Sequence, residues 1–169
     1  MEPEGKEIIM GEHDLIVSKT DKKGWITYCN KTCADISEYH RNELIGSPHS
    51  IFRSRAMPRC VFKLLWDRIA AGHEVFAYVV NKSKNDNHYW VFAHVTPSRD
   101  LEGNITGYHS NRRKPVDRAL TAIRPLYAAL LDEEKKYKNR KEGLAASTVL
   151  LNRVLEQKGM EYDEFVLSV

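Results

Sequence analysis

The sequence predicts an α+β domain, in which five antiparallel strands form one sheet with short helices on one face, followed by C-terminal helices. Two short segments before residue 30 and three after residue 74 have the β-branched and aromatic composition of strands. Signals for several short helices and one long helix lie between the two groups. The predicted order is therefore strand, strand, helices and then three strands.

The first two strands are predicted to form a hairpin. Leu15-Ile16-Val17 begins the first strand, and Trp25 to Cys29 forms the second. Between them, Asp21-Lys22-Lys23-Gly24 is typical of a turn that joins two apolar segments. We therefore expect the second strand to pair back on the first.

Three short helical turns are predicted after this hairpin. Asn30 can cap the first, because its side-chain oxygen can accept a bond from a free amide at a helix start. The second covers residues 41–45 and ends at Gly46. Residues 48–53 form the third.

The strongest helix signal of the first half covers residues 57–71. Pro58 suits a first helical turn, and Gly72 follows the last one. Its apolar face is formed by residues at helical spacing: Val61, Leu64, Leu65, Trp66 and Ile69.

Three further strands are predicted before residue 115. They cover residues 75–80, 89–95 and 105–111. Lys84-Asn85-Asp86-Asn87 and Asp100 to Asn104 have turn composition. We expect Pro97 to end the middle strand, since proline has no amide to donate.

Beyond Pro115 the sequence predicts two helices. Apolar residues recur at helical spacing from Leu120 to Tyr137, with Pro125 as a kink or a fresh start. Residues 138–143 are predicted to be a polar hinge, and a second helix covers residues 144–158 before Gly159. The apolar side chains of residues 163–167 then need a covering surface, in this subunit or another.

Composition excludes several classes of function. The formal charge is only +3, from 26 basic and 23 acidic residues, and we assign the basic run Arg112-Arg113-Lys114 to the solvated surface. Nucleic acid is therefore not expected as a partner. No apolar run reaches the roughly 20 residues that span a bilayer, and the N-terminus is too polar for a signal peptide. With three cysteines in no metal or disulfide pattern, we expect a cytoplasmic protein without direct membrane insertion.

Catalysis is not expected. The sequence contains no nucleophile–base set, no paired carboxylates on a recognisable scaffold and no cluster of metal ligands. We therefore predict that the protein is not an enzyme.

The residues from Tyr28 to Pro115 resemble a PAS sensor domain of the bacterial aerotaxis-receptor type. The resemblance is carried by Asn81, His88-Tyr89-Trp90-Val91, Thr96-Pro97 and Gly103 to Tyr108. It divides the chain into an N-terminal segment (1–12), a PAS sensor domain (13–115) and a C-terminal helical extension (116–169). It implies redox or oxygen sensing through non-covalently bound FAD, between the sheet and the short helices.

The resemblance implies a set of flavin-pocket residues. Asn81 has an amide that can bond a ring carbonyl and ring NH, Arg53 can pair with phosphate or with a reduced ring, and Trp66 and Trp90 can line an apolar wall. Structural alternatives stay open for five of the expected residues. They are a turn for Asn81, a surface position for Arg53, core packing for Trp66, a cap of the short turn for His49 and a helix cap for Asn30. The full set of expected cofactor residues is Asn30, His49, Arg53, Trp66, Asn81 and Trp90.

The chain also departs from the family pattern. Ser54 and Ala56 stand where the family has histidine and aspartate, Val75 replaces a common tryptophan, and Ser83 interrupts the usual Arg-Lys pair. These changes favour an alternative, a cofactor-free PAS module that acts through its C-terminal helices. A haem-binding gas sensor is a third possibility, for which the available histidines are His49, His73, His88 and His94.

No histidine-kinase, methyl-accepting or nucleotide-cyclase segment follows residue 115. We therefore expect output through a separate signalling protein, a receptor or a kinase. We also expect a homodimer.

Overall fold

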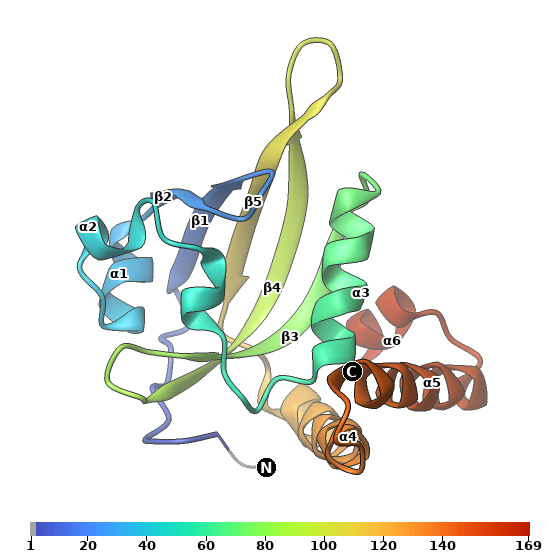
Figure 1. The fold of residues 1–169 in the computed structure, drawn as a ribbon. Coiled ribbons are helices and arrows are strands. Elements are labelled where there is room, and N and C mark those ends of the chain that lie inside the picture. Colours follow the sequence, from blue (N-terminus) through green and yellow to red (C-terminus); the bar gives the residue numbers. More distant parts are fainter. Residues whose placement is uncertain (1–2) are drawn as a thin grey trace.

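The computed structural model describes residues 3–169 (Figure 1). Met1 and Glu2, which belong to the predicted N-terminal segment 1–12, lie outside the described residues. A five-stranded antiparallel sheet has the order β2-β1-β5-β4-β3, and helices flank it, as predicted. The strands are β1 (Leu15–Asp21), β2 (Ile26–Cys29), β3 (Val75–Lys82), β4 (His88–Arg99) and β5 (Ile105–Arg113). The helices are α1 (Lys31–Ser37), α2 (Arg41–Leu44), the 3₁₀ helix η1 (His49–Phe52), α3 (Arg59–Ala70), α4 (Asp117–Lys135), α5 (Arg140–Lys158) and α6 (Tyr162–Ser168).

β1 and β5, the first and last strands in chain order, lie side by side in the middle of the sheet. β1 pairs with β5 along its whole length, with Ser18 opposite Ser110. Because side chains alternate between the faces of a strand, Ser18 and Ser110 point to the same side. This pairing brings residues almost a hundred positions apart onto one wall.

The sheet has one face toward α3 and η1 and another toward α4. Val79 and Ala93 point to the α3 face, and they line a cavity with residues of that helix. On the opposite face, the ring of Trp90 lies 5.9 Å from that of Tyr127 of α4, and the Tyr127 hydroxyl donates to the Tyr78 carbonyl at 2.5 Å. The apolar core is therefore built on both sides of the sheet.

The N-terminal residues complete the sheet where β5 ends. The main chain of Ile8 donates to His88 at 2.7 Å, and His88 donates to Lys6 at 3.0 Å. β5 pairs with β4 only as far as Phe92, so the first residues of β4 would otherwise lack a neighbour on that side. The segment that precedes β1 thus forms an isolated parallel bridge to β4, between Glu7 and His88.

Pro97 does not end β4, contrary to the prediction. β4 continues to Arg99 and Pro97 lies opposite Tyr108 of β5. β3 pairs with β4 only up to Val95, so Pro97 has a neighbour on one side only. A proline without an amide is tolerated at such an edge position.

The C-terminal helices pack back on this same subunit. Pro125 lies inside a continuous α4, so it does not start a new helix. α5 begins at Arg140 rather than residue 144, because the side chain of Asn139 accepts from the Lys141 amide and caps it. The apolar chain end forms α6, which the sequence analysis did not predict, and this helix packs on β3 with Phe165 and Val166 buried.

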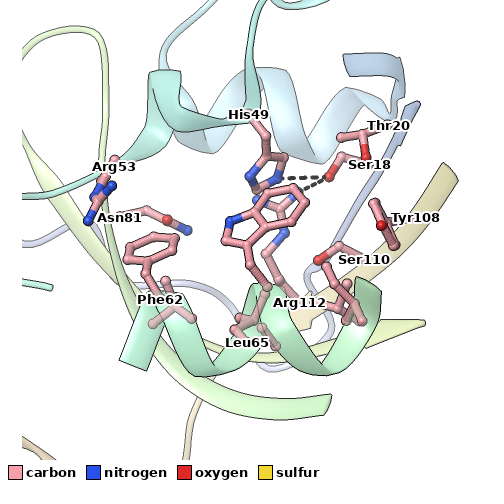
Figure 2. Close-up of a pocket in the computed structure, with 15 residues that line it drawn as sticks. Ser18, Thr20, His49, Arg53, Phe62, Leu65, Asn81, Tyr108, Ser110 and Arg112 are labelled. Carbon is pink, nitrogen blue, oxygen red and sulfur yellow. Dashed lines mark hydrogen bonds between the residues drawn. The ribbon is translucent and has the colours of Figure 1, made fainter. Parts of the chain in front are cut away.

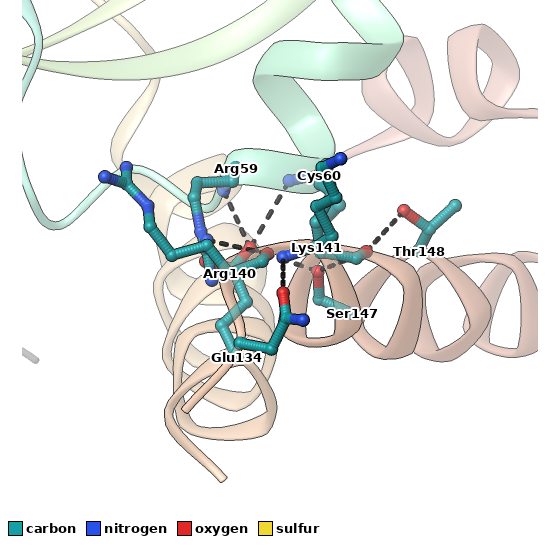
Figure 3. A network of polar contacts seen from close by, with 9 residues as sticks. Arg59, Cys60, Glu134, Arg140, Lys141, Ser147 and Thr148 are labelled. Atoms are coloured by element: carbon teal, nitrogen blue, oxygen red, sulfur yellow. Dashed lines mark hydrogen bonds and ion pairs between the residues drawn. The ribbon is translucent and has the colours of Figure 1, made fainter. Parts of the chain in front are cut away.

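A buried carboxylate ties α4 to the start of α3 (Figure 3). Glu134 accepts from the Arg59 amide at 2.8 Å, from Arg59 Nε at 2.7 Å and from Ser147 Oγ of α5 at 3.0 Å. Negative charge at a helix N-terminus is stabilising, and α3 begins at Arg59. One side chain therefore connects α3, α4 and α5.

Across residues 3–169, no helix is both long and apolar enough to cross a membrane.

Candidate functional site

A cavity of about 60 Å³ lies between the sheet, α3 and η1 (Figure 2). α3 supplies its apolar wall and the strands supply most of its polar groups. Its lining residues are Ser18, Thr20, His49, Arg53, Phe62, Leu65, Trp66, Ile69, Val79, Asn81, Ala93, Val95, Tyr108, Ser110 and Arg112.

The Trp66 side chain reaches from α3 to the turn between β1 and β2. Its ring lies edge-on to that of Tyr108, with 5.6 Å between centroids. A Cβ atom placed on Gly24 of that turn would lie 3.1 Å from Trp66 Cη2. Trp66 therefore covers the part of the cavity nearest this hairpin.

Asn81 and Arg53 lie together at another side of the cavity (Figure 2). Their main chains form an isolated antiparallel bridge, which fixes η1 against the free edge of β3. The Asn81 side chain is 3% exposed, and its Nδ2 has no hydrogen-bond partner among residues 3–169. The Arg53 guanidinium lies 4.5 Å from the centroid of the Phe62 ring.

A polar chain of three residues crosses the cavity (Figure 2). Arg112 Nη2 donates to Ser18 Oγ at 2.5 Å, and Ser18 Oγ is hydrogen-bonded to His49 Nε2 at 3.4 Å. Desolvation, together with the positive charge of Arg112, lowers the pKa of His49 from 6.5 to about 3. The imidazole is therefore neutral at physiological pH.

Four of the six expected cofactor residues meet at this cavity, and two do not. His49, Arg53, Trp66 and Asn81 line it. The Asn30 side chain instead bonds three main-chain groups: its Oδ1 accepts from Val17 and Cys33, and its Nδ2 donates to Leu15. Asn30 thus caps α1 and holds it against β1.

Trp90 lies on the opposite face of the sheet, which contradicts the expectation that it shares a wall with Trp66. It pairs with Val80, whereas the cavity residue Val79 pairs with Val91. Its ring packs against Tyr127, with the Arg124 guanidinium 5.3 Å from its centroid. Counting alternate positions along β4 separates the two faces, because successive side chains point to opposite sides.

Of the four histidines considered for haem, His49 alone lines the cavity. His88 Nδ1 lies 2.9 Å from the Glu4 carbonyl, and His94 is stacked on Phe76 on the outer face of the sheet. The residue His73 follows α3 and does not line the cavity. His49 is already hydrogen-bonded to Ser18.

Arg112 lines the cavity, although it was predicted to lie on the solvated surface. Arg112 is 2% exposed, whereas its neighbour Arg113 is exposed. The signal that could have found it is the period of two along β5, since Arg112 follows Ser110 and Tyr108 at alternate positions. Neighbouring basic residues at the end of a strand can therefore lie on opposite faces, one buried and one exposed.

The polar groups of the cavity suit a flavin ring, but the present cavity is smaller than one. Unpartnered Asn81 Nδ2 and the Arg112 guanidinium can donate to ring nitrogen and oxygen acceptors. The cavity measures about 60 Å³, whereas ligand pockets measure about 300–1,000 Å³. A tricyclic ring therefore requires side chains such as Trp66 to move.

Comparisons with known proteins agree with this architecture. Residues 5–110 match the model of the PAS fold family. Over 121 residues, 72% of this chain, the sequence is 36% identical to the aerotaxis receptor of Escherichia coli. The match covers 24% of that receptor, so the chain spans about a quarter of its length.

Several solved structures share the fold. A light-oxygen-voltage domain studied with a flavin analogue is 17% identical, with a TM-score of 0.58 over 73% of this chain and 87% of that one. The dark-state Aureochrome1 domain of the same class is 22% identical, with a TM-score of 0.55 over 72% and 84%. The light-state dimer of the fungal photoreceptor Vivid is 18% identical, with a TM-score of 0.55 over 63% and 83%. At these identities the likeness concerns the fold alone.

Proposed function

The chain belongs to the PAS family, and on this basis we propose that it is a sensory module that holds FAD non-covalently in the cavity beside α3. We propose that it senses redox state or oxygen in an aerotaxis-like pathway. The observation that carries the proposal is the buried Nδ2 of Asn81, a donor that lines the cavity and has no hydrogen-bond partner among residues 3–169. The chain that presents this donor is 36% identical to an aerotaxis receptor over 121 residues.

Each cavity residue has a proposed task. Asn81 presents an amide to the edge of the ring, where buried donors require acceptors. Arg53, exposed at the cavity mouth, suits the phosphate groups of the cofactor. Trp66 packs on the ring after it has turned away from Gly24. FAD, when bound, supplies an isoalloxazine that accepts and releases electrons.

We propose that α3 carries the signal from the cavity to the C-terminal helices. α3 provides Trp66 to the cavity wall, and its first residue is bound by Glu134 of α4. A shift of α3 that accompanies a ligand therefore acts on the α4–α5 pair through one carboxylate. The size of the effect is limited by the difference in ligand affinity between the two positions of the helix.

In this proposal, residues 13–115 form the sensor and residues 116–169 form the output segment. We propose a cytoplasmic location, since three buried free cysteines suit a reducing compartment. A homodimer and a separate receptor or kinase as the signalling partner remain part of the proposal.

An absorption spectrum of the purified protein tests the flavin. We expect flavin bands as purified or after reconstitution with FAD, and weaker FAD binding in the variant Asn81→Leu. Asn111→Leu is the matched control, because Asn111 lies in the sheet but does not line the cavity. A protein that takes up no FAD would refute the proposal, and a haem spectrum would favour a gas sensor.

A cofactor-free interaction module is the second candidate. The small cavity favours it, as does the presence of Ser54 and Ala56, both buried, in place of the family's histidine and aspartate. In that case the purified protein shows no cofactor absorbance, and its C-terminal helices alone provide the binding surface.

A further inference from the structure

Arg112 carries a positive charge inside the cavity without an acidic partner. The side chain is 2% exposed and lines the cavity beside Ser18. Nη2 donates to Ser18 Oγ and lies 3.9 Å from Cys33 Sγ, whereas Nε and Nη1 have no hydrogen-bond partner within the described chain. An arginine side chain stays protonated in proteins, so the charge cannot be removed by losing a proton.

The groups that face Arg112 do not neutralise it. Burial keeps His49 uncharged, and it raises the pKa values of the Tyr89 hydroxyl and the Cys33 thiol, so both keep their protons. The Phe52 ring lies 5.6 Å from the guanidinium carbon. Among residues 3–169, no aspartate or glutamate lines the cavity, and the second charged residue there is Arg53, also basic.

A second arginine of this chain shows the usual arrangement. Arg59, which is only partly buried, has its Nε 2.7 Å from the Glu134 carboxylate. A buried charge is retained at acceptable cost when it is paired and its remaining donors are bonded. Arg112 is more deeply buried than Arg59 but has a hydroxyl and a thiol instead of a carboxylate.

We propose that Arg112 determines ligand specificity: the cavity takes a planar aromatic ligand whose buried edge carries negative charge and supplies the missing acceptors for Nε and Nη1. The inference rests on the proposed function in that the cavity is taken as the ligand site, and it adds the charge of the ligand. A neutral or cationic ring of the same shape leaves the guanidinium without a negative partner and binds more weakly than an anionic one. For a flavin, the charged edge is that of a ring with anionic character.

Two small probes of equal shape and different charge test this specificity. Benzoate and benzamide are each titrated into the full chain, and binding is followed by NMR through the Asn81 side-chain amide and the Trp66 indole signal. We expect benzoate to bind at least about tenfold more tightly than benzamide, as a charge-assisted bond predicts. Equal affinities, or no binding of either probe at the cavity, would overturn the proposal.

Variants identify the residue responsible. Arg112→Met keeps the length of the side chain and should fold, since an apolar residue replaces an unpaired buried charge. It should abolish the preference for benzoate, whereas Arg112→Lys should keep a reduced preference. Arg113→Gln, at the exposed neighbouring position, is the control and should leave the preference unchanged.

The outcomes separate this inference from the flavin proposal. If Arg112→Met retains the benzoate preference, the inference is wrong even when FAD binds. If the preference depends on Arg112 but the protein takes up no FAD, the inference stands and the flavin proposal fails. Should Arg112→Met not fold, a preference unchanged in Arg112→Lys would count against the role of the guanidinium.

Discussion

His49 shows how a single residue changes character when it is placed inside the cavity. On sequence alone it was a candidate cofactor residue or a cap of a short turn. In the structure it begins η1, its ring packs edge-on to Phe52 at 5.3 Å, and it bonds to Ser18. Its environment, desolvated and next to Arg112, excludes a second positive charge.

The lowered pKa of His49 predicts a loss of stability in mild acid. The pKa of His49 is about 3 in the folded protein and about 6.5 in the unfolded chain. The unfolded chain therefore binds more protons between these pH values. Stability is therefore complete above pH 6.5 and is lost as the pH falls toward 3. Because the residue is partly exposed, we expect about 1–2 kcal/mol between pH 6.5 and 4, less than the full pKa shift implies.

Urea unfolding at several pH values measures this effect. The variant His49→Gln removes the titrating group and should show a flatter pH dependence over that range. His73→Gln is the control, since His73 is exposed after α3 and does not line the cavity. An equal pH dependence in wild type and His49→Gln would contradict the burial of a neutral imidazole.

Individual residues also show what local patterns cannot determine. Asn30 was predicted both as a helix cap and as a ligand residue; the cap is confirmed, and its amide is fully used by main-chain groups. Arg112 and Trp90 were misplaced because their environments depend on which side of a strand faces α3. That choice follows from strand pairing across the whole chain, which no short window of sequence contains.

At the scale of elements, the contact between the β1–β2 turn and α3 closes one side of the cavity. Gly24 has φ +84°, a region that glycine adopts without cost, and Trp66 lies directly over it. Gly103, in the β4–β5 turn, has nearly the same φ of +85° but no atom within 4 Å of an added Cβ. The two glycines therefore differ mainly in the Trp66 contact.

This pair of turns predicts two different costs for the same substitution. Gly103→Ala should lower the free energy of unfolding by about 1 kcal/mol, because alanine is strained in the left-handed conformation. Gly24→Ala should cost more, because Trp66 must also move away from the new methyl group. Thermal unfolding gives the two free energies, and FAD uptake or benzoate binding should change in Gly24→Ala only. Identical effects of the two variants would show that Trp66 does not depend on this turn.

Most elements were predictable from local signals, and the exceptions have a common cause. The sheet, the helix after Pro58 and the stop at Gly159 follow from composition, capping and glycine. β4 extends past Pro97 because its neighbour β3 has already ended there. α6 forms because β3 offers a surface to Phe165 and Val166, and the short sequence has little helical length of its own.

At the scale of the whole molecule, the C-terminal helices form one body with the sensor. α5 packs on α3, α6 packs on β3, and α4 contacts the outer face of the sheet through Tyr127. The extension is therefore bound to the two elements that build the cavity wall, rather than attached to the domain only at Pro115. Under the proposed function, a ligand in the cavity would therefore act on helices that are already packed on the domain.

Glu134 is the group on which this connection depends most. It is 6% exposed and bonds Arg59, Cys60 and Ser147. Replacing it with glutamine removes the negative charge that both pairs with Arg59 and lies at the start of α3. This should lower the free energy of unfolding by about 3 kcal/mol. Glu133→Gln is the matched control, because its partner Lys136 lies on the surface.

Hydrogen exchange tests whether this group couples the cavity to the output helices. We expect a cavity ligand, benzoate or FAD, to change the protection of amides at the start of α3 and in α5 around Leu151, which is buried. The β4–β5 turn around Leu101, which is fully exposed, should not respond. In Glu134→Gln the response should remain at α3, which lines the cavity directly, and disappear from α5. A response of α5 that survives this substitution would mean that the signal travels through the sheet and α6 instead, because β3 is the other element shared by the cavity and the C-terminal helices.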